Sequence, residues 1–130
     1  MVIDASVVLA AAIDGAASGN WARGLLARAS PLVAPHLLPV EVTHRLRKLT
    51  AQGLVPEQVA TLELVQIAKL SISYFPFLPL MARVWELRNN VSAYDAWYVA
   101  LAEALKAPLA TLDTRLVRAS GPTCQFQTYV

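Results

Sequence analysis

Residues 92–116 read SAYDAWYVALAEALKAPLATLDTRL and decide the fold. Residues 92–106 place apolar side chains at helical spacing behind a serine, and this pattern predicts the clearest helix in the chain. The apolar run Leu109–Leu112 that follows has the length of a short strand. Asp95 lies in the first turn of this helix, and Asp113 comes directly after the strand. A long helix leading into a short apolar strand is typical of α/β folds.

Short apolar strands alternate with helices along the rest of the chain. Strands are expected at Val2–Ile3, Leu32–Ala34, Leu70–Phe75, Leu109–Leu112 and Gln125–Tyr129. Helices are expected at Ala5–Ile13, at Asn20–Ala29 with Ser18 as its cap, at Leu38–Ala51, at Pro56–Lys69, from Pro79 onward, at Ser92–Lys106 and at Thr114–Ala119. This alternation predicts an α/β fold in which a mainly parallel sheet has helices on both faces.

Length and composition limit the classes of protein. The chain has 130 residues, which predicts one domain over residues 1–130. Its mean hydropathy is +0.46, yet no apolar run approaches the roughly 18 residues that a membrane helix needs. Asp4 is unfavourable in a signal peptide, and the single cysteine, Cys124, cannot form an intrachain disulfide. We therefore expect a cytoplasmic protein with no membrane segment, and its net charge of +2 permits RNA binding.

Four carboxylates stand in apolar stretches, although the chain has only 9 acidic residues. Asp4 and Asp113 follow predicted strands, Asp95 opens a helix, and Glu41 lies inside an apolar helix. The carboxyl ends of parallel strands meet at one edge of a sheet, so these side chains can converge there. Several buried carboxylates repel one another unless a cation lies between them. The pattern favours an oxygen-rich site for Mg²⁺ or Mn²⁺.

Each acid also has a local explanation that spacing alone leaves open. These alternatives are helix caps at Asp4 and Asp113, an ion pair between Glu41 and Arg45, and a capping box from Ser92 to Asp95. Zinc is not expected, because the two histidines, His36 and His44, form no Cys/His cluster. Arg45, Arg47 and Lys48 cluster on one predicted helix and are candidates for phosphate contacts, and Trp97 is expected in the core.

Three stretches resemble the PIN-domain ribonucleases, and more narrowly the VapC toxins of toxin–antitoxin modules. They are VIDASVVLA at residues 2–10, LLPVEVTHRLRKL at residues 37–49 and SAYDAWYVALAEALKAPLATLDTRL at residues 92–116. The resemblance implies an α/β/α sandwich around a parallel sheet. It places the four family acids on Asp4, Glu41, Asp95 and Asp113, and the family's small hydroxyl residue on Ser6.

The resemblance also implies Mg²⁺- or Mn²⁺-dependent hydrolysis of RNA phosphodiester bonds by a bound water. Asp4 and Asp95 are expected as the main metal ligands, with Asp113 and Glu41 completing the site directly or through water. Ser6 and Thr111 are expected to orient ligands or waters, and local capping bonds are the alternative for both hydroxyls.

The implied partners are the RNA substrate, a cognate VapB-like antitoxin and a second copy of the chain in a homodimer. A candidate apolar surface for a partner comprises Leu54, Val55, Val59, Leu62, Val65 and Ile67. Two alternatives remain open. The first alternative is a non-catalytic PIN module that binds RNA or protein, and the second is a receiver-type phosphoacceptor domain. The intact acids disfavour the first, and the single acid after the first strand disfavours the second.

Overall fold

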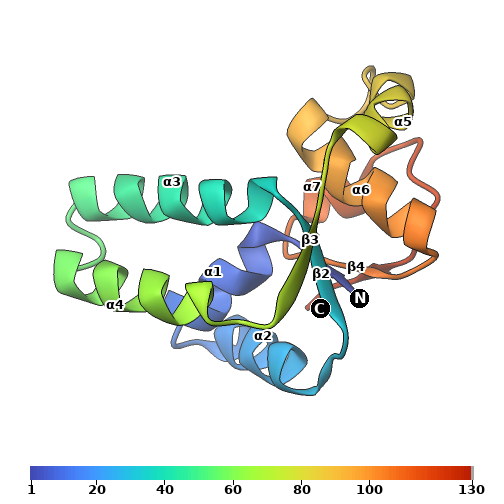
Figure 1. Ribbon diagram of the computed structural model, residues 1–130. Helices are drawn as coiled ribbons and strands as arrows, with labels where there is room; N and C mark the ends of the chain where they lie inside the picture. The colour runs from blue at the N-terminus through green and yellow to red at the C-terminus, as the bar shows by residue number, and fades with distance from the viewer. Residues whose placement is uncertain (130) are drawn as a thin grey trace.

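A computed structural model describes residues 1–129 and contains a parallel sheet of five strands (Figure 1). Their order across the sheet is β3-β2-β1-β4-β5. The strands are β1 Val2–Ile3, β2 Leu32–Pro35, β3 Ile72–Phe75, β4 Leu109–Ala110 and β5 Phe126–Gln127. All four pairings between neighbouring strands are parallel. The parallel α/β prediction is confirmed, and the N-terminal strand lies at the centre of the sheet.

Helices cover both sides of the sheet, as the alternating pattern predicted. Figure 1 shows α1 to α4 on one side of the strands and α5 and α6 on the other. The helices are α1 Ala5–Ile13, α2 Ala17–Arg28, α3 Leu37–Ala51, α4 Glu57–Ala68, the 3₁₀ turn η1 Leu78–Leu80, α5 Met81–Glu86, α6 Ala93–Leu105 and α7 Thr114–Arg118. None of the helices within residues 1–129 is long and apolar enough to cross a bilayer.

The core explains why such short strands hold their places. Val2, Ile3, Leu109 and Ala110 are fully buried, because helices cover the two central strands on both faces. Helix α6 packs directly on β1, β2 and β4. The burial of α6 and the central strands fixes the positions from which Asp4, Asp95 and Asp113 project.

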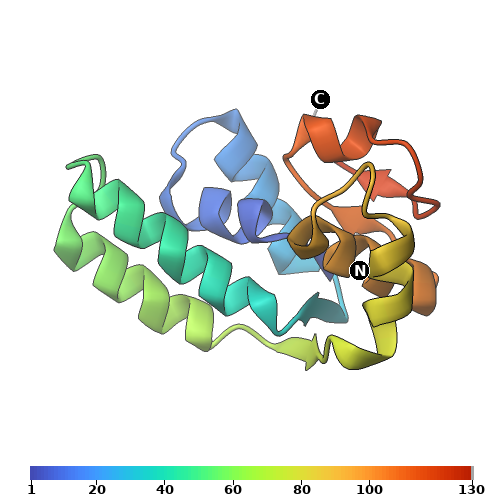
Figure 2. The same cartoon turned by 90° about the horizontal axis from the view of Figure 1, so that it is seen from above.

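Helices α3 and α4 form a long antiparallel pair that extends away from the sheet (Figure 2). The turn between them uses Gly53 at φ +71°, a left-handed conformation that glycine adopts without strain. The predicted apolar surface lies on this pair, but it divides into two parts. Ile67 is buried, whereas Leu54 and Leu62 are 69% and 64% exposed.

Two details of the helix prediction are wrong. Helix α2 begins at Ala17, so Ser18 lies inside it and does not cap it. Its hydroxyl instead donates to the Asp14 carboxylate, whose other oxygen accepts from the Ala16 backbone N–H. Asp14 therefore organises this turn from outside the helix. Pro79 lies within the 3₁₀ turn η1, and the α-helix begins two residues later.

Candidate active site

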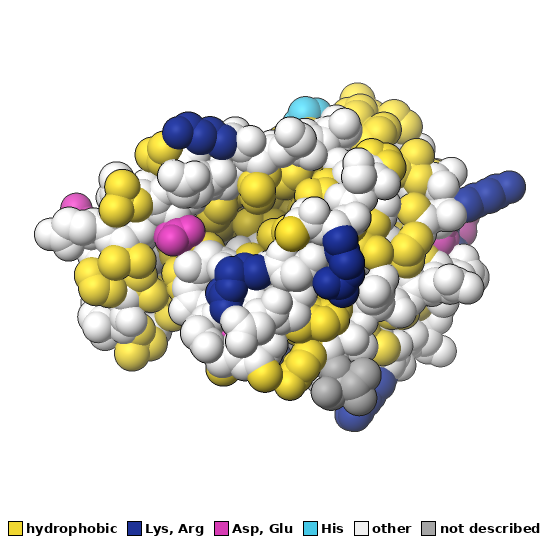
Figure 3. Space-filling model, turned by 90° about the horizontal axis from the view of Figure 1, so that it is seen from below, with side chains coloured by type: hydrophobic (Ala, Val, Ile, Leu, Met, Phe, Trp, Pro, Cys, Tyr) yellow, Lys and Arg dark blue, Asp and Glu magenta, His cyan; other side chains and the backbone are white. Residues whose placement is uncertain are grey.

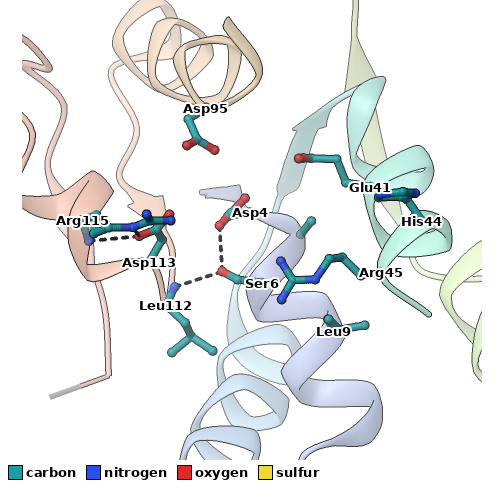
Figure 4. A pocket seen from close by; sticks show the side chains of 11 residues that line it. Asp4, Ser6, Leu9, Glu41, His44, Arg45, Asp95, Leu112, Asp113 and Arg115 are labelled. Carbon is teal, nitrogen blue, oxygen red and sulfur yellow. Dashed lines mark hydrogen bonds and ion pairs between the residues drawn. The ribbon is translucent and has the colours of Figure 1, made fainter. Parts of the chain in front are cut away.

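The four acids line one open cavity of about 430 Å³ at the carboxyl edge of the central strands (Figure 4). Asp4 follows β1 and Asp113 lies three residues after β4, and these two strands are parallel neighbours. Asp95 enters from the first turn of α6, and Glu41 enters from α3. Side chains from positions 4, 41, 95 and 113 therefore share one site, although each comes from a different element.

Asp4 is held by two hydroxyl groups. Its Oδ2 accepts hydrogen bonds from Ser6 Oγ at 2.7 Å and from Thr111 Oγ1 at 2.8 Å. The same hydroxyls accept backbone N–H groups, Ser6 from Leu112 and Thr111 from Asp113, each at 3.0 Å. Because a hydroxyl has one proton, accepting these N–H groups directs that proton toward Asp4. The alternative role of Asp4 as a side-chain cap of α1 is not observed, since its carboxylate makes no capping hydrogen bond to that helix.

Glu41 is held by a residue that sequence reasoning missed. Tyr98 on α6 is fully buried, and its hydroxyl donates to Glu41 Oε1 at 2.6 Å. Burial, together with the acceptor Glu41, raises the pKa of Tyr98 far above its ordinary value, so the hydroxyl stays a donor. No ion pair joins Glu41 to Arg45 among the described residues. Its spacing could have indicated this role, because Tyr98 lies three residues after Asp95 and therefore on the same face of the helix.

The local explanations hold in part for the other two acids. Ser92 caps α6, because its Oγ accepts the Asp95 backbone N–H at 3.2 Å. Asp113 caps α7 through Oδ1, which accepts the backbone N–H groups of Arg115 and Leu116 at 3.0 and 3.3 Å. The cap at α6 uses the backbone of Asp95, so its carboxylate remains directed into the cavity (Figure 4).

Three of the cavity acids, Asp4, Glu41 and Asp95, lie in an environment that disfavours their charged forms. Burial is the main reason that the pKa values of Asp4, Glu41 and Asp95 are raised. Repulsion adds to this, since Asp113 raises the pKa of Asp4 and Asp95, and Asp4 raises that of Glu41. Asp4 is only 7% exposed, and its hydrogen-bond donors are neutral hydroxyls.

Side-chain spacing limits how such a site can hold an ion. Among residues 1–129, no three Asp, Glu, His or Cys side chains lie close enough to hold one ion directly. The carboxylates surround the cavity and do not converge on a single point. Mg²⁺ keeps several waters and usually takes one or two carboxylates, so this spacing suits an ion that is held partly through water.

The sequence is similar to known proteins along most of its length. The pattern of the PIN domain matches residues 1–122. The chain belongs to the PIN-domain family. Ribonuclease VapC1 of Mycobacterium tuberculosis is 42% identical over 127 residues, which cover 97% of this chain and 95% of that protein. The predicted membership in the VapC group of PIN domains is thus confirmed.

Solved structures of other PIN-type toxins have the same fold. VapC20 of Mycobacterium tuberculosis, described as a sarcin-ricin loop cleaving toxin, has a TM-score of 0.70 at 16% identity, over 90% of this chain and 92% of that chain. VapBC2 of Rickettsia felis, bound to a DNA fragment from its promoter, has a TM-score of 0.68 at 13% identity. The match covers 98% of this chain and 96% of that chain. At these identities the likeness shows the fold alone.

The structure shows which basic residues line the cavity and which lie outside it, a distinction that the sequence did not provide. Arg45 from α3 and Arg115 from α7 line the cavity, and so does His44. Arg47 and Lys48 are exposed on α3 outside it. Arg83 lies elsewhere and donates to Glu103 and Glu86, at 2.8 and 3.0 Å.

Three further side chains are placed as follows. His36 stacks against Tyr74, away from the cavity. Trp97 was expected in the core; it is partly buried at the border of the core, where it packs edge-on against Phe77. Burial raises the pKa of Cys124 to about 11, which keeps the thiol protonated.

The raised pKa values predict how the stability of the metal-free PIN domain depends on pH. In the unfolded chain the carboxyls titrate near pH 4, and in the fold Asp4, Glu41 and Asp95 titrate higher. Between these values the folded state binds more protons, so the free energy of unfolding should fall as pH rises through the window. Urea denaturation in EDTA at a series of pH values measures this slope, and Asp4→Asn should make it shallower. A stability that rises across the window would contradict the burial of these acids.

Proposed function

We propose that this PIN domain is an Mg²⁺- or Mn²⁺-dependent endoribonuclease and the toxin of a VapBC-type toxin–antitoxin pair. The observation that carries the proposal is Asp4, a buried carboxylate that has no cationic partner among residues 1–129 and that faces Glu41 and Asp95 across an open cavity. Buried charges in proteins are paired or coordinate metals. Membership in the VapC group supports RNA as the substrate.

The residues present suit a hard divalent cation. The donors are carboxylate oxygens, which Mg²⁺ and Mn²⁺ prefer, and within residues 1–129 the cavity lining contains no cysteine. We assign Asp4 and Asp95 as the main ligands, with Asp113 and Glu41 binding directly or through water. A cation there would offset the repulsion that raises the carboxyl pKa values.

Each group has a part in phosphodiester hydrolysis. A divalent cation held by Asp4 and Asp95 would supply an activated water as nucleophile and would offset the negative charge on the phosphate oxygens. Ser6 and Thr111 hold Asp4 in one orientation and tie it to the backbone that carries Asp113. Arg45 and Arg115 line different walls of the cavity and would bind phosphates of the RNA.

The basic residues lining the cavity predict a salt effect. Arg45→Ala and Arg115→Ala should each weaken RNA binding and reduce the slope of log affinity against log salt by roughly 0.7 to 1. Arg47→Ala is the matched control, because Arg47 lies on the same helix outside the cavity. Fluorescence anisotropy with a labelled RNA in EDTA measures both quantities. Equal slopes for all three variants would remove Arg45 and Arg115 from the substrate path.

A cleavage assay tests the enzyme and separates it from its alternatives. The purified chain should cut RNA with Mg²⁺ or Mn²⁺ and stop in EDTA. A non-catalytic PIN module would bind RNA without cutting it. A receiver-type phosphoacceptor would become labelled by a small phosphodonor, but membership in the PIN family already disfavours it. Sequencing the RNA ends would then identify the substrate.

The partners follow from the exposed apolar side chains. Leu54, Val59, Leu62 and Val65 are exposed on the α3–α4 pair or its connecting turn. We propose that a VapB-like antitoxin covers apolar surface of this kind and that the toxin forms a homodimer. RNA as substrate implies that the pair acts in the cytoplasm.

Growth measurements test the toxin role. Expressed alone, the chain should slow bacterial growth, and co-expression of the small protein encoded beside it should restore growth. Glu41→Gln and Asp113→Asn should abolish the toxicity, because both remove a cavity charge. Both variants should still co-purify with the antitoxin, because the apolar surface is unchanged. Toxicity that survives in both variants would show that the effect does not come from RNA cleavage.

A further inference from the structure

The contact between Tyr98 and Glu41 joins the two sides of the cavity. Tyr98 belongs to α6 and Glu41 to α3, and 57 positions separate them in the chain. The 2.6 Å bond reaches only Oε1 of the carboxylate. Figure 4 shows the Glu41 carboxylate directed from α3 toward Asp4. The bond therefore fixes which way the carboxylate group is turned.

We propose that Tyr98 is a positioning residue that makes Glu41 a one-oxygen donor and thereby selects Mg²⁺ or Mn²⁺ over Ca²⁺. This inference rests on the proposed function. The buried hydroxyl binds Oε1, so Oε2 is the oxygen that Glu41 offers to the cavity.

The two classes of cation differ in what they require from a carboxylate. Mg²⁺ demands near-ideal octahedral geometry and takes single oxygens from carboxylates together with waters. Ca²⁺ is larger, accepts six to eight oxygens and readily takes both oxygens of one carboxylate. A glutamate with one oxygen engaged elsewhere is suited to the first class and poorly suited to the second.

The Tyr98 hydroxyl is fixed strongly enough for this role. The Tyr98 side chain is fully buried, and its helix α6 packs directly on the sheet. If Glu41 rotated to chelate with both oxygens, the Tyr98 hydroxyl would lose its acceptor inside the core, which is costly. Ser6 and Thr111 do the same for Asp4, since both bind a single oxygen, Oδ2.

The test compares metal affinities of the whole chain in the absence of RNA. Tyr98→Phe removes the hydroxyl and keeps the ring. Isothermal titration with MgCl₂, MnCl₂ and CaCl₂ should show Mg²⁺ and Mn²⁺ affinities reduced by roughly ten- to a hundredfold, the range for groups that orient a metal ligand. The affinity for Ca²⁺ should be unchanged or higher, so the preference for Mg²⁺ over Ca²⁺ falls.

Two controls isolate the hydroxyl. Tyr94→Phe removes an exposed hydroxyl from the same helix and should leave all three affinities unchanged. In a Glu41→Gln background, Tyr98→Phe should change the preference no further, because Tyr98 acts through Glu41. Equal losses for Mg²⁺ and Ca²⁺ would mean a general structural role and overturn the inference, as would unchanged affinities. If the wild-type chain binds no divalent ion and cuts no RNA, the proposed function itself fails.

Discussion

Replacing Asp4 with asparagine should reduce metal-dependent RNA cleavage by at least about a hundredfold, since even groups that only orient a metal ligand contribute ten- to a hundredfold. The same change should not destabilise the metal-free protein at neutral pH. The folded state raises the pKa of Asp4, so its charge costs stability above the ordinary carboxyl pKa, and asparagine removes that cost. The amide oxygen can still accept from Ser6 and Thr111.

Thermal melts with and without Mg²⁺ measure the stability part of this prediction. Wild type should gain about 2.7 kcal/mol at a hundredfold excess of metal over its dissociation constant, and Asp4→Asn should gain much less. Asp14→Asn is the matched control, because Asp14 also accepts two hydrogen bonds but lies outside the cavity. If metal stabilises all three proteins equally, the ion binds somewhere else.

The second large effect is expected at Asp95. Asp95→Asn should abolish most metal-dependent cleavage while the protein stays folded. The cap of α6 uses the Asp95 backbone N–H and the Ser92 hydroxyl, so asparagine leaves the cap intact. Ser92→Ala is the opposite change, since it removes the cap and keeps the charge. It should lower the free energy of unfolding by about 1 kcal/mol and preserve most cleavage.

These two variants separate the catalytic and structural interpretations of the same turn. Cleavage rates and urea denaturation of both proteins give the comparison. An Asp95→Asn protein that remains active but unfolds easily would assign the carboxylate to helix capping. A Ser92→Ala protein that is stable but inactive would move the essential group from the carboxylate to the hydroxyl.

Much of the fold could be predicted because its strands and helices differ in pattern. The apolar run at 109–112 and the long helix before it have few alternative structures. The helix formed where expected, and the strand covers the first two residues of the predicted run. Details failed where a side chain outside the element decides its end. Ser18 has the chemistry of a cap, but the carboxylate of Asp14 organises that turn and moves the helix start. Helix propensity and capping preference alone do not predict that the Asp14 carboxylate takes the hydrogen bond of the Ser18 hydroxyl.

The four acids could be selected from the sequence because charge in an apolar stretch is unusual. The structure brings them to one cavity, and their catalytic roles remain predictions. The partners of these acids were harder to foresee. Tyr98 resembles any other aromatic residue of a buried helix, and only the packing of α6 against α3 reveals that its hydroxyl meets Glu41. Arg45 and Arg47 likewise differ only in which side of α3 they occupy.

The central position of β1 has a consequence for synthesis of the protein. The first strand pairs with β4, which the ribosome adds more than a hundred residues later. Until then Asp4 lacks Thr111 as a donor, and the cavity lacks Asp113. A chain that has not reached Thr111 and Asp113 lacks two groups of the cavity, so the proposed site cannot assemble before residue 113 has been made. An antitoxin that recognises the earlier helices would have that interval in which to bind.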